Sequence, residues 1–331
     1  MRLSRFARFA WAVLAYNLAV IAWGAYVRAS GSGAGCGAHW PLCDGRVLPR
    51  EPTIELAVEL SHRVTSGIAL VLVVGLVVAA FRAYPRGSIV RRGAVATLVF
   101  MLAEALIGAG LVLFELVAHD ASMKRALSMS LHLTNTFFLL AAMTLTAHWA
   151  SGGARVRVRG QGLVGGVLAA AMGAMFVLGT SGAVAALGDT LFPARSLAEG
   201  LAQDASATAH AFVRLRVLHP LLATATAALV IGAAAVARWT RPSLRVQRAS
   251  RLVTIVFVAQ YAIGLANLAL LAPIPMQLLH LVTADCVWIA LVLLAATALA
   301  EAPDQPPIIS RNGPGPSSDV PPSTRNVAPV T

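Results

Sequence analysis

Eight long apolar segments, separated by shorter polar ones, account for most of the chain. Each is long enough to cross the hydrocarbon core of a bilayer, which takes about 20 helical residues. Backbone polar groups in lipid must be satisfied within their own segment, so helices are expected throughout. The expected spans are 9–29, 60–81, 94–117, 127–149, 163–187, 217–239, 252–271 and 277–300. The pattern predicts an all-α integral membrane protein with eight transmembrane helices.

Composition strengthens this prediction. Of the 331 residues, 58% are hydrophobic and only 12% are charged, whereas soluble domains carry about 25% charged residues. The net charge of +12 does not indicate a nucleic-acid partner, because most arginines gather at the N-terminus and in alternate polar segments. The positive-inside rule places those segments in the cytoplasm. We therefore expect a multi-pass protein of the cell (inner) membrane, with both termini cytoplasmic.

The spans form two groups of four with a similar layout. In each group, the first span ends in small residues, an aromatic–proline pair follows, and the next span carries a histidine. Internal repeats of this weak kind are common in membrane proteins. The layout predicts two pseudo-repeated four-helix bundles, 1–150 and 151–301. Residues 302–331 are rich in Pro, Ser and Gly and are expected to form a disordered cytoplasmic tail.

Four histidines lie near the starts of the even-numbered spans, two in each half: His62, His132, His219 and His280. Even-numbered spans start at the outer face, so all four share one depth. One such histidine is more typical of a hydrogen-bonded interior side chain, but four at one depth indicate ligands. Neutral imidazole binds metals and haem iron, and facing helices of a bundle can hold a cofactor between them. The sequence predicts one bis-histidine haem site per half, near the outer face.

Charged residues beside these histidines divide the two halves. Glu59 lies three residues before His62, so the two share a helix face, whereas Arg216 stands three residues before His219. This asymmetry predicts that the N-terminal site performs chemistry and that the C-terminal site holds a cofactor. The alternative for Glu59 is a charged collar at the membrane rim. Arg63, Arg214 and Arg216 are either contacts for haem propionates or interfacial anchors.

Two of the three cysteines, Cys36 and Cys43, lie in the first outer segment. An outer segment faces an oxidising compartment, where disulfides persist. A structural disulfide is the preferred interpretation, and a redox-active thiol pair that meets another thiol enzyme is the alternative.

These residues together resemble the haem A synthase family. The resemblance is carried by residues 27–33 (VRASGSG), Cys36, residues 40–43 (WPLC), Gly45 and residues 59–63 (ELSHR), the last being similar to the family's Glu-x-x-His-Arg motif. His132, His219 with Pro220, and His280 fall where the family's other haem ligands fall. The resemblance covers all eight spans and leaves out the tail.

This resemblance implies an oxidoreductase that converts the C8 methyl group of haem O into the formyl group of haem A. It implies that the substrate haem lies between His62 and His132, with Glu59 as the catalytic acidic residue, and that a haem b cofactor lies between His219 and His280. It also implies haem O synthase as the supplier and terminal oxidase assembly as the destination of the product. Assembly factors, the lipid bilayer and a second copy of the chain are the partners considered.

Two other function classes remain open on the sequence. A dihaem b-type electron-transfer protein, without methyl oxidation, explains the four histidines equally well but gives Glu59 and the cysteine segment no role. A haem-free transporter built from repeated bundles explains the layout alone. The haem carried by the purified protein separates all three classes.

Overall fold

The computed structural model describes residues 3–46 and 53–300, and this part of the chain is helical without named strands. Its elements are α1 (Arg5–Ala29), η1 (Ser32–Ala34), α2 (Ile54–Ala83), α3 (Ile89–Leu113), α4 (Met123–Ala150), α5 (Gly162–Leu191), α6 (Leu197–Ala205), α7 (Ala211–Arg216), α8 (Leu218–Thr240), α9 (Leu244–Ala269) and α10 (Ile274–Ala298). With α7 and α8 taken together, eight helices in these ranges are long and apolar enough to cross a membrane. The predicted fold class is confirmed. The tail expected at 302–331 lies outside the described residues.

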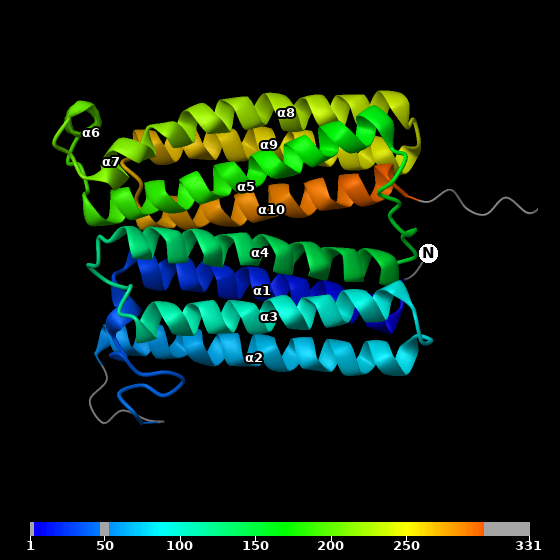
Figure 1. Ribbon diagram of the computed structural model, residues 1–331, viewed down its shortest axis with the longest axis horizontal. Helices are drawn as coiled ribbons and strands as arrows, with labels where there is room; N and C mark the ends of the chain where they lie inside the picture. The colour runs from blue at the N-terminus through cyan, green and yellow to red at the C-terminus, as the bar shows by residue number, and fades with distance from the viewer. Residues whose placement is uncertain (1–2, 47–52, 301–331) are drawn as a thin grey trace, which may run out of the picture. The chain divides into compact units, whose positions relative to one another are not determined.

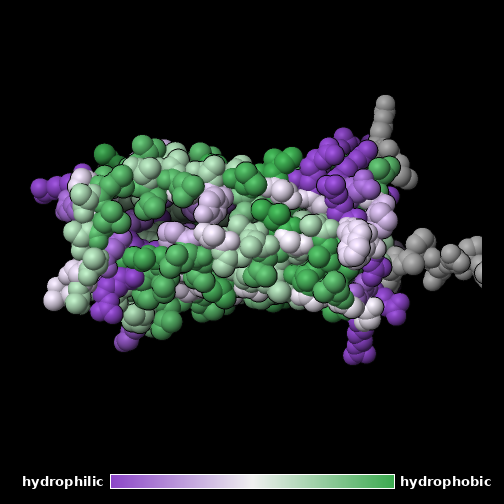
Figure 2. All heavy atoms as spheres, turned by 90° about the horizontal axis from the view of Figure 1, so that it is seen from above, coloured by the Kyte–Doolittle hydropathy of each residue, from purple (hydrophilic) through white to green (hydrophobic). Residues whose placement is uncertain are grey.

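Helices α1–α4 lie side by side in one group, and α5, α8, α9 and α10 form the other (Figure 1). The groups meet where α4 packs against α5 and α10, and where α1 packs against α10. Apolar side chains form a broad band between two hydrophilic ends (Figure 2), as a multi-pass membrane protein requires. The repeat and the boundary at residue 150 stay predictions.

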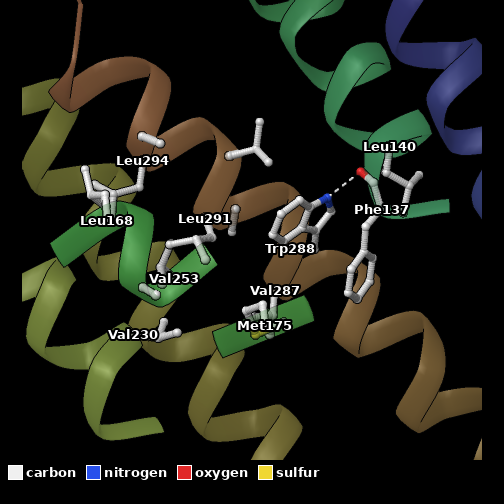
Figure 3. Close-up of a cluster of buried hydrophobic side chains, with 14 of the residues drawn as sticks. Phe137, Leu140, Leu168, Met175, Val230, Val253, Val287, Trp288, Leu291 and Leu294 are labelled. Carbon is white, nitrogen blue, oxygen red and sulfur yellow. Dashed lines mark hydrogen bonds between the residues drawn. The ribbon is translucent and has the colours of Figure 1, made fainter. Parts of the chain in front are cut away.

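The contact between the two groups is centred on Trp288 of α10. Its indole Nε1 donates to the backbone carbonyl of Phe137 on α4 at 2.7 Å, and the two rings stack with centroids 4.9 Å apart (Figure 3). Phe176 of α5 meets the same indole edge-on. Because lipid tails are as apolar as the side chains, helices in membranes associate through close packing and interhelical hydrogen bonds. This cluster therefore fixes α4, α5 and α10 to one another.

Two helix boundaries bear on the site. Helix α2 begins six residues earlier than expected, because the Thr53 hydroxyl accepts from the Leu56 N–H and caps a polar first turn. Capping of this kind satisfies a donor that otherwise has no partner. Between α7 and α8 the helix breaks at Val217. Pro220 lacks the N–H that would bond to the carbonyl of Arg216, which explains the interruption.

Candidate functional site

A large cavity of about 1510 Å³ contains all four predicted ligands in its wall. His62 comes from α2, His132 from α4, His219 from α8 and His280 from α10. Small-molecule pockets usually measure roughly 300–1,000 Å³, so this cavity has room for more than one such ligand. The structure thus brings together the four histidines that the sequence singled out.

The four histidines also lie at a similar depth. His62, His132 and His219 stand eight, nine and eight residues after the first residues of their spans, Ile54, Met123 and Ala211. His280 stands six residues after Ile274. At about 1.5 Å of rise per residue, all four lie roughly 9–14 Å below their helix starts. They form one layer across both groups of helices.

In the C-terminal half, His219 and His280 face one another. Their ring centroids are 6.2 Å apart and their planes are nearly perpendicular. The Ser181 hydroxyl donates to the Leu178 carbonyl at 2.8 Å and lies 3.0 Å from His219 Nδ1, from which it can accept. With the Ser181 hydroxyl as acceptor, the Nδ1–H tautomer is favoured and Nε2 is left available to a metal.

In the N-terminal half, His62 and His132 line the same cavity. The Nδ1 atoms of both rings are buried and make no hydrogen bond within the described residues. A carboxylate oxygen of Glu104 on α3 is 3.4 Å from His132 Nδ1. Buried polar atoms without partners are rare in native proteins, and here they belong to the groups predicted to bind.

Each of these rings rests against a glycine of a neighbouring helix. A Cβ added to Gly24, Gly182 or Gly264 would lie 2.8, 3.0 or 2.9 Å from the Cε1 atom of His62, His219 or His280. A Cβ added to Gly108 would lie 3.9 Å from the Cε1 atom of His132. Small residues let helices approach closely in lipid. At three of the four positions, even alanine would press on the ring.

These features fit haem. Two imidazoles on opposite faces of one metal need centroids about 6 Å apart, since each metal–nitrogen bond is about 2 Å long and each ring nitrogen lies about 1 Å from its ring centre. His219 and His280 meet that spacing. The largely apolar wall of the cavity suits the hydrophobic body of a porphyrin, and His62 and His132 stand in that wall as well.

Glu59 and Arg63 hold the outer segment onto α2. The buried Glu59 carboxylate accepts from the Cys36 N–H at 2.8 Å and from the Arg63 guanidinium. Arg63 also donates to the carbonyls of His39 and Leu42, each at 2.7 Å. A disulfide between Cys36 and Cys43 closes this segment, as predicted. Glu59 lines the same cavity as His62, so the segment and the site share one carboxylate.

The three arginines predicted as propionate contacts bind groups of the protein itself in this structure. Arg216 is held by Asp204 at 2.6 Å and by Asp189 at 3.3 Å, which ties α7 to α5 and to the end of α6. Arg214 is exposed and, among the described residues, its side chain reaches the Ala207 carbonyl alone, at 3.5 Å. The guanidinium of Arg63 is likewise engaged by the protein. Contacts of these three arginines with propionates stay a prediction.

The sequence analysis assigned no role to four charged residues that line the cavity, although one of them, Arg28, belongs to the segment 27–33: Arg28, Glu104, Arg125 and Asp285. Arg28 on α1 donates to the Ala186 carbonyl and to Gln277, both at 3.0 Å, and so links both groups of helices. Asp285 on α10 is fully buried, and neither oxygen has a hydrogen-bond partner among the described residues. For Glu104 and Asp285 the available signal was a position inside an apolar span, where ionisable residues mark functional sites by default. Arg125 lies just before the expected span 127–149 and gave no such signal.

Comparison with known proteins identifies the family of the chain. The family model described as cytochrome oxidase assembly protein matches residues 7–292. A protoheme IX farnesyltransferase of Thermus thermophilus is 49% identical over 296 residues, which is 89% of this chain and 49% of the relative. The chain therefore spans about half the length of the Thermus relatives that it matches.

Heme A synthases of Exiguobacterium sp. and Bacillus mycoides are similar over a shorter region. They are 40% identical over 96 residues and 41% identical over 97 residues, which is 29% of this chain and 32% or 31% of the relative. The family model, by contrast, covers nearly all of the helical part. The chain belongs to the family of cytochrome oxidase assembly proteins.

Proposed function

We propose that this chain is a haem A synthase, which oxidises the C8 methyl group of haem O to a formyl group. The observation that carries the proposal is the combination of two pairs of histidines in one cavity with a buried carboxylate, Glu59, one turn from His62. Family membership and the similarity to heme A synthases support it. Glu59 stands three residues before His62, whereas Arg216 stands three residues before His219. This asymmetry supports a reacting site in the N-terminal half and a cofactor site in the C-terminal half.

In this proposal, His62 and His132 hold haem O as substrate, and His219 and His280 hold haem b. Bound haem supplies the redox chemistry, which its axial ligands and their hydrogen bonds tune. The chain's contribution is orientation: Ser181 fixes the ring of His219, and glycines set the depth to which each ring enters. The apolar walls keep bulk water from the reacting edge.

Glu59 is proposed as the group that moves protons during the reaction. Conversion of methyl to formyl is a four-electron oxidation that also needs an oxygen atom. With water as the oxygen source, four protons leave the site and an external electron acceptor takes the four electrons. The Cys36 N–H and Arg63 fix the carboxylate beside the cavity. Positioned acids and bases of this kind contribute roughly 10²–10⁴-fold to rate.

The membrane setting follows the same proposal. The basic turns lie at one end of the helices and the disulfide segment lies at the other, which supports cytoplasmic termini in the inner cell membrane and haem sites near the outer face. A haem O synthase would supply the substrate, and assembly factors of terminal oxidases would receive the product.

A second activity is favoured by the Thermus relatives, which are named protoheme IX farnesyltransferase. That name belongs to chains about twice the length of the matched region. A farnesyltransferase makes haem O from haem b, whereas the proposed synthase consumes haem O. The two activities are therefore distinguished by their products.

The deciding experiment types the haem made in membranes of a host that lacks both its own haem A synthase and its own haem O synthase. Membranes containing the chain receive haem O, or haem b with farnesyl diphosphate, and the extracted haem is identified by mass. Formation of haem A from haem O supports the synthase. Formation of haem O from haem b assigns the transferase instead. A protein that binds two b haems and changes neither is an electron-transfer protein.

A further inference from the structure

The four predicted ligands differ in what contacts the ring nitrogen that would not bind iron. His219 Nδ1 meets the Ser181 hydroxyl, and His280 meets the Gln260 amide. His62 Nδ1 has no partner within the described residues. His132 Nδ1 also makes no hydrogen bond among the described residues, but a carboxylate oxygen of Glu104 lies 3.4 Å from it. Among the contacts described, a carboxylate therefore approaches just one of the four rings.

Glu104 and Gln260 occupy equivalent places in the two halves. Glu104 lies four residues before Gly108 on α3, and Gly108 faces His132 on α4. Gln260 lies four residues before Gly264 on α9, and Gly264 faces His280 on α10. Residues four apart share a helix face. The same structural position thus carries a carboxylate in the proposed substrate half and a neutral amide in the proposed haem b half.

The carboxylate of Glu104 is fixed in place. Its two oxygens accept from Thr136 Oγ1 and Asn135 Nδ2, each at 2.5 Å. Asn135 Nδ2 also donates to the Phe100 carbonyl at 2.9 Å. Both donors lie within about one turn of His132 on α4, so Glu104 moves with the ligand helix. Hydrogen bonds at such sites are often long before a ligand binds and tighten in the complex.

The amide of Gln260 holds His280 without a net charge. Gln260 Nε2 lies 3.1 Å from His280 Nδ1 and 3.3 Å from its Nε2, while Gln260 Oε1 is buried and without a hydrogen-bond partner among the described residues. The nitrogen and oxygen ends of an amide are assigned from the hydrogen bonds that they make. With the two ends exchanged, Gln260 Oε1 would accept from the ring N–H of His280. In either orientation the contact is between neutral groups.

We propose that Glu104 is a positioning residue that directs the Nδ1–H of His132 to a carboxylate and so makes His132 a stronger electron donor than His280. This inference rests on the proposed function, because it takes both histidines as axial ligands. A carboxylate on the outer nitrogen fixes the tautomer and raises the basicity of a metal-bound imidazole. A more basic ligand stabilises oxidised iron, so the charge of Glu104 holds the reduction potential of the N-terminal haem below the value that an amide would give.

Reciprocal substitutions test this proposal: Glu104→Gln, Gln260→Glu and the double exchange. Each haem-loaded protein is titrated by spectroelectrochemistry in detergent, and its haem content is measured. We expect Glu104→Gln to raise one midpoint potential and Gln260→Glu to lower the other, so that the two variants identify the two sites. Loss of a partner of this kind commonly costs about 10–100-fold in metal affinity, so Glu104→Gln should also release haem more readily. Glu115→Gln, at an exposed position, is the matched control and should change neither potential.

The outcomes separate this inference from the proposed function. The inference is overturned if Glu104→Gln keeps its full haem content and leaves both midpoint potentials unchanged. It is also overturned if Glu104→Gln and Gln260→Glu shift the same one of the two midpoint potentials. If Glu104→Gln loses its N-terminal haem, Gln260→Glu decides, and an unchanged potential there overturns the inference. Potentials that shift as expected in a protein that forms no haem A would retain the inference and refute the synthase.

Discussion

The carboxylate of Glu59 accepts a hydrogen bond from the backbone N–H of Cys36 at 2.8 Å, across 23 residues of sequence. The residue that the sequence marks as a candidate for proton transfer is therefore also the anchor of the disulfide segment. Its other oxygen is paired with Arg63. Any test of Glu59 must keep its shape, so that loss of chemistry is separated from loss of the anchor.

Glu59→Gln is expected to fold and to retain haem b, because the amide oxygen can still accept from Cys36. It should lower haem A formation by roughly 10²–10⁴-fold, the usual contribution of a general acid or base, and accumulate haem O or a partly oxidised product. Extracted haem typed by mass provides the measurement. Glu55→Gln, exposed in the first turn of the same helix, is the control. A normal yield of haem A from Glu59→Gln would assign Glu59 a purely structural role.

His219→Ala and His280→Ala should each remove a low-spin haem spectrum, because a bis-histidine site needs both rings. The two rings face one another with their centroids 6.2 Å apart. Optical and paramagnetic resonance spectra of the purified variants measure this loss. His119→Ala, at an exposed position of an outer segment, controls for histidine loss in general. If both variants kept full haem b and an unchanged spectrum, the assignment of this pair would be wrong.

Gly264→Ala should displace the ring of His280, since the new Cβ would lie 2.9 Å from His280 Cε1. We expect lower haem occupancy in the C-terminal half, even though alanine favours a helix over glycine by about 1 kcal/mol. Gly232→Ala on α8 is the matched control, because nothing lies within 4 Å of its added Cβ. Haem-to-protein ratios of the two variants give the comparison, and equal ratios would contradict the packing argument.

The disulfide predicts a definite labelling pattern. Denatured protein prepared without reductant should react at Cys286 alone, and reduction should expose Cys36 and Cys43 as well. Breaking the bond by Cys36→Ser should lower stability by about 2–3 kcal/mol, on the basis of loop-closure entropy. Thiol labelling followed by mass spectrometry tests the first expectation, and thermal unfolding of the variant tests the second. Three reactive thiols before reduction would refute a structural disulfide.

The sequence predicted the spans and the layer of histidines well, because length and hydropathy determine which segments cross a membrane. It placed the start of α2 too late, since the polar residues before Leu60 looked like loop and only the capping contact of Thr53 shows that they are helical. It also left the partners of Arg63 and Arg216 open. Those partners are carbonyls and carboxylates of other segments, and a linear pattern does not reveal such contacts.

Glu104 shows more clearly that a linear sequence pattern does not reveal contacts between segments. An acidic residue inside an apolar span is visible in the sequence, but its meaning depends on which helix face it shares and which ring it approaches. Its correspondence with Gln260 emerges only when both are referred to the glycines that contact His132 and His280. Spacing along one helix was readable in advance, whereas the register between neighbouring helices required the structure.

The contacts of His219 with Ser181 and Gly182 have a consequence for the order of events during assembly. A side chain immobilised on binding usually costs about 0.5–1.5 kcal/mol of ordering, and a ring already held by its neighbours has little of that freedom left to lose. The C-terminal half therefore presents a preorganised receptor. The ring of His62 also rests against a glycine, Gly24, but its Nδ1 has no partner in the described part of the chain, so it lacks the hydrogen bond that restrains His219. A newly made protein should accordingly take up its permanent cofactor before its substrate, so that exchange of haem is confined to the half where turnover requires it.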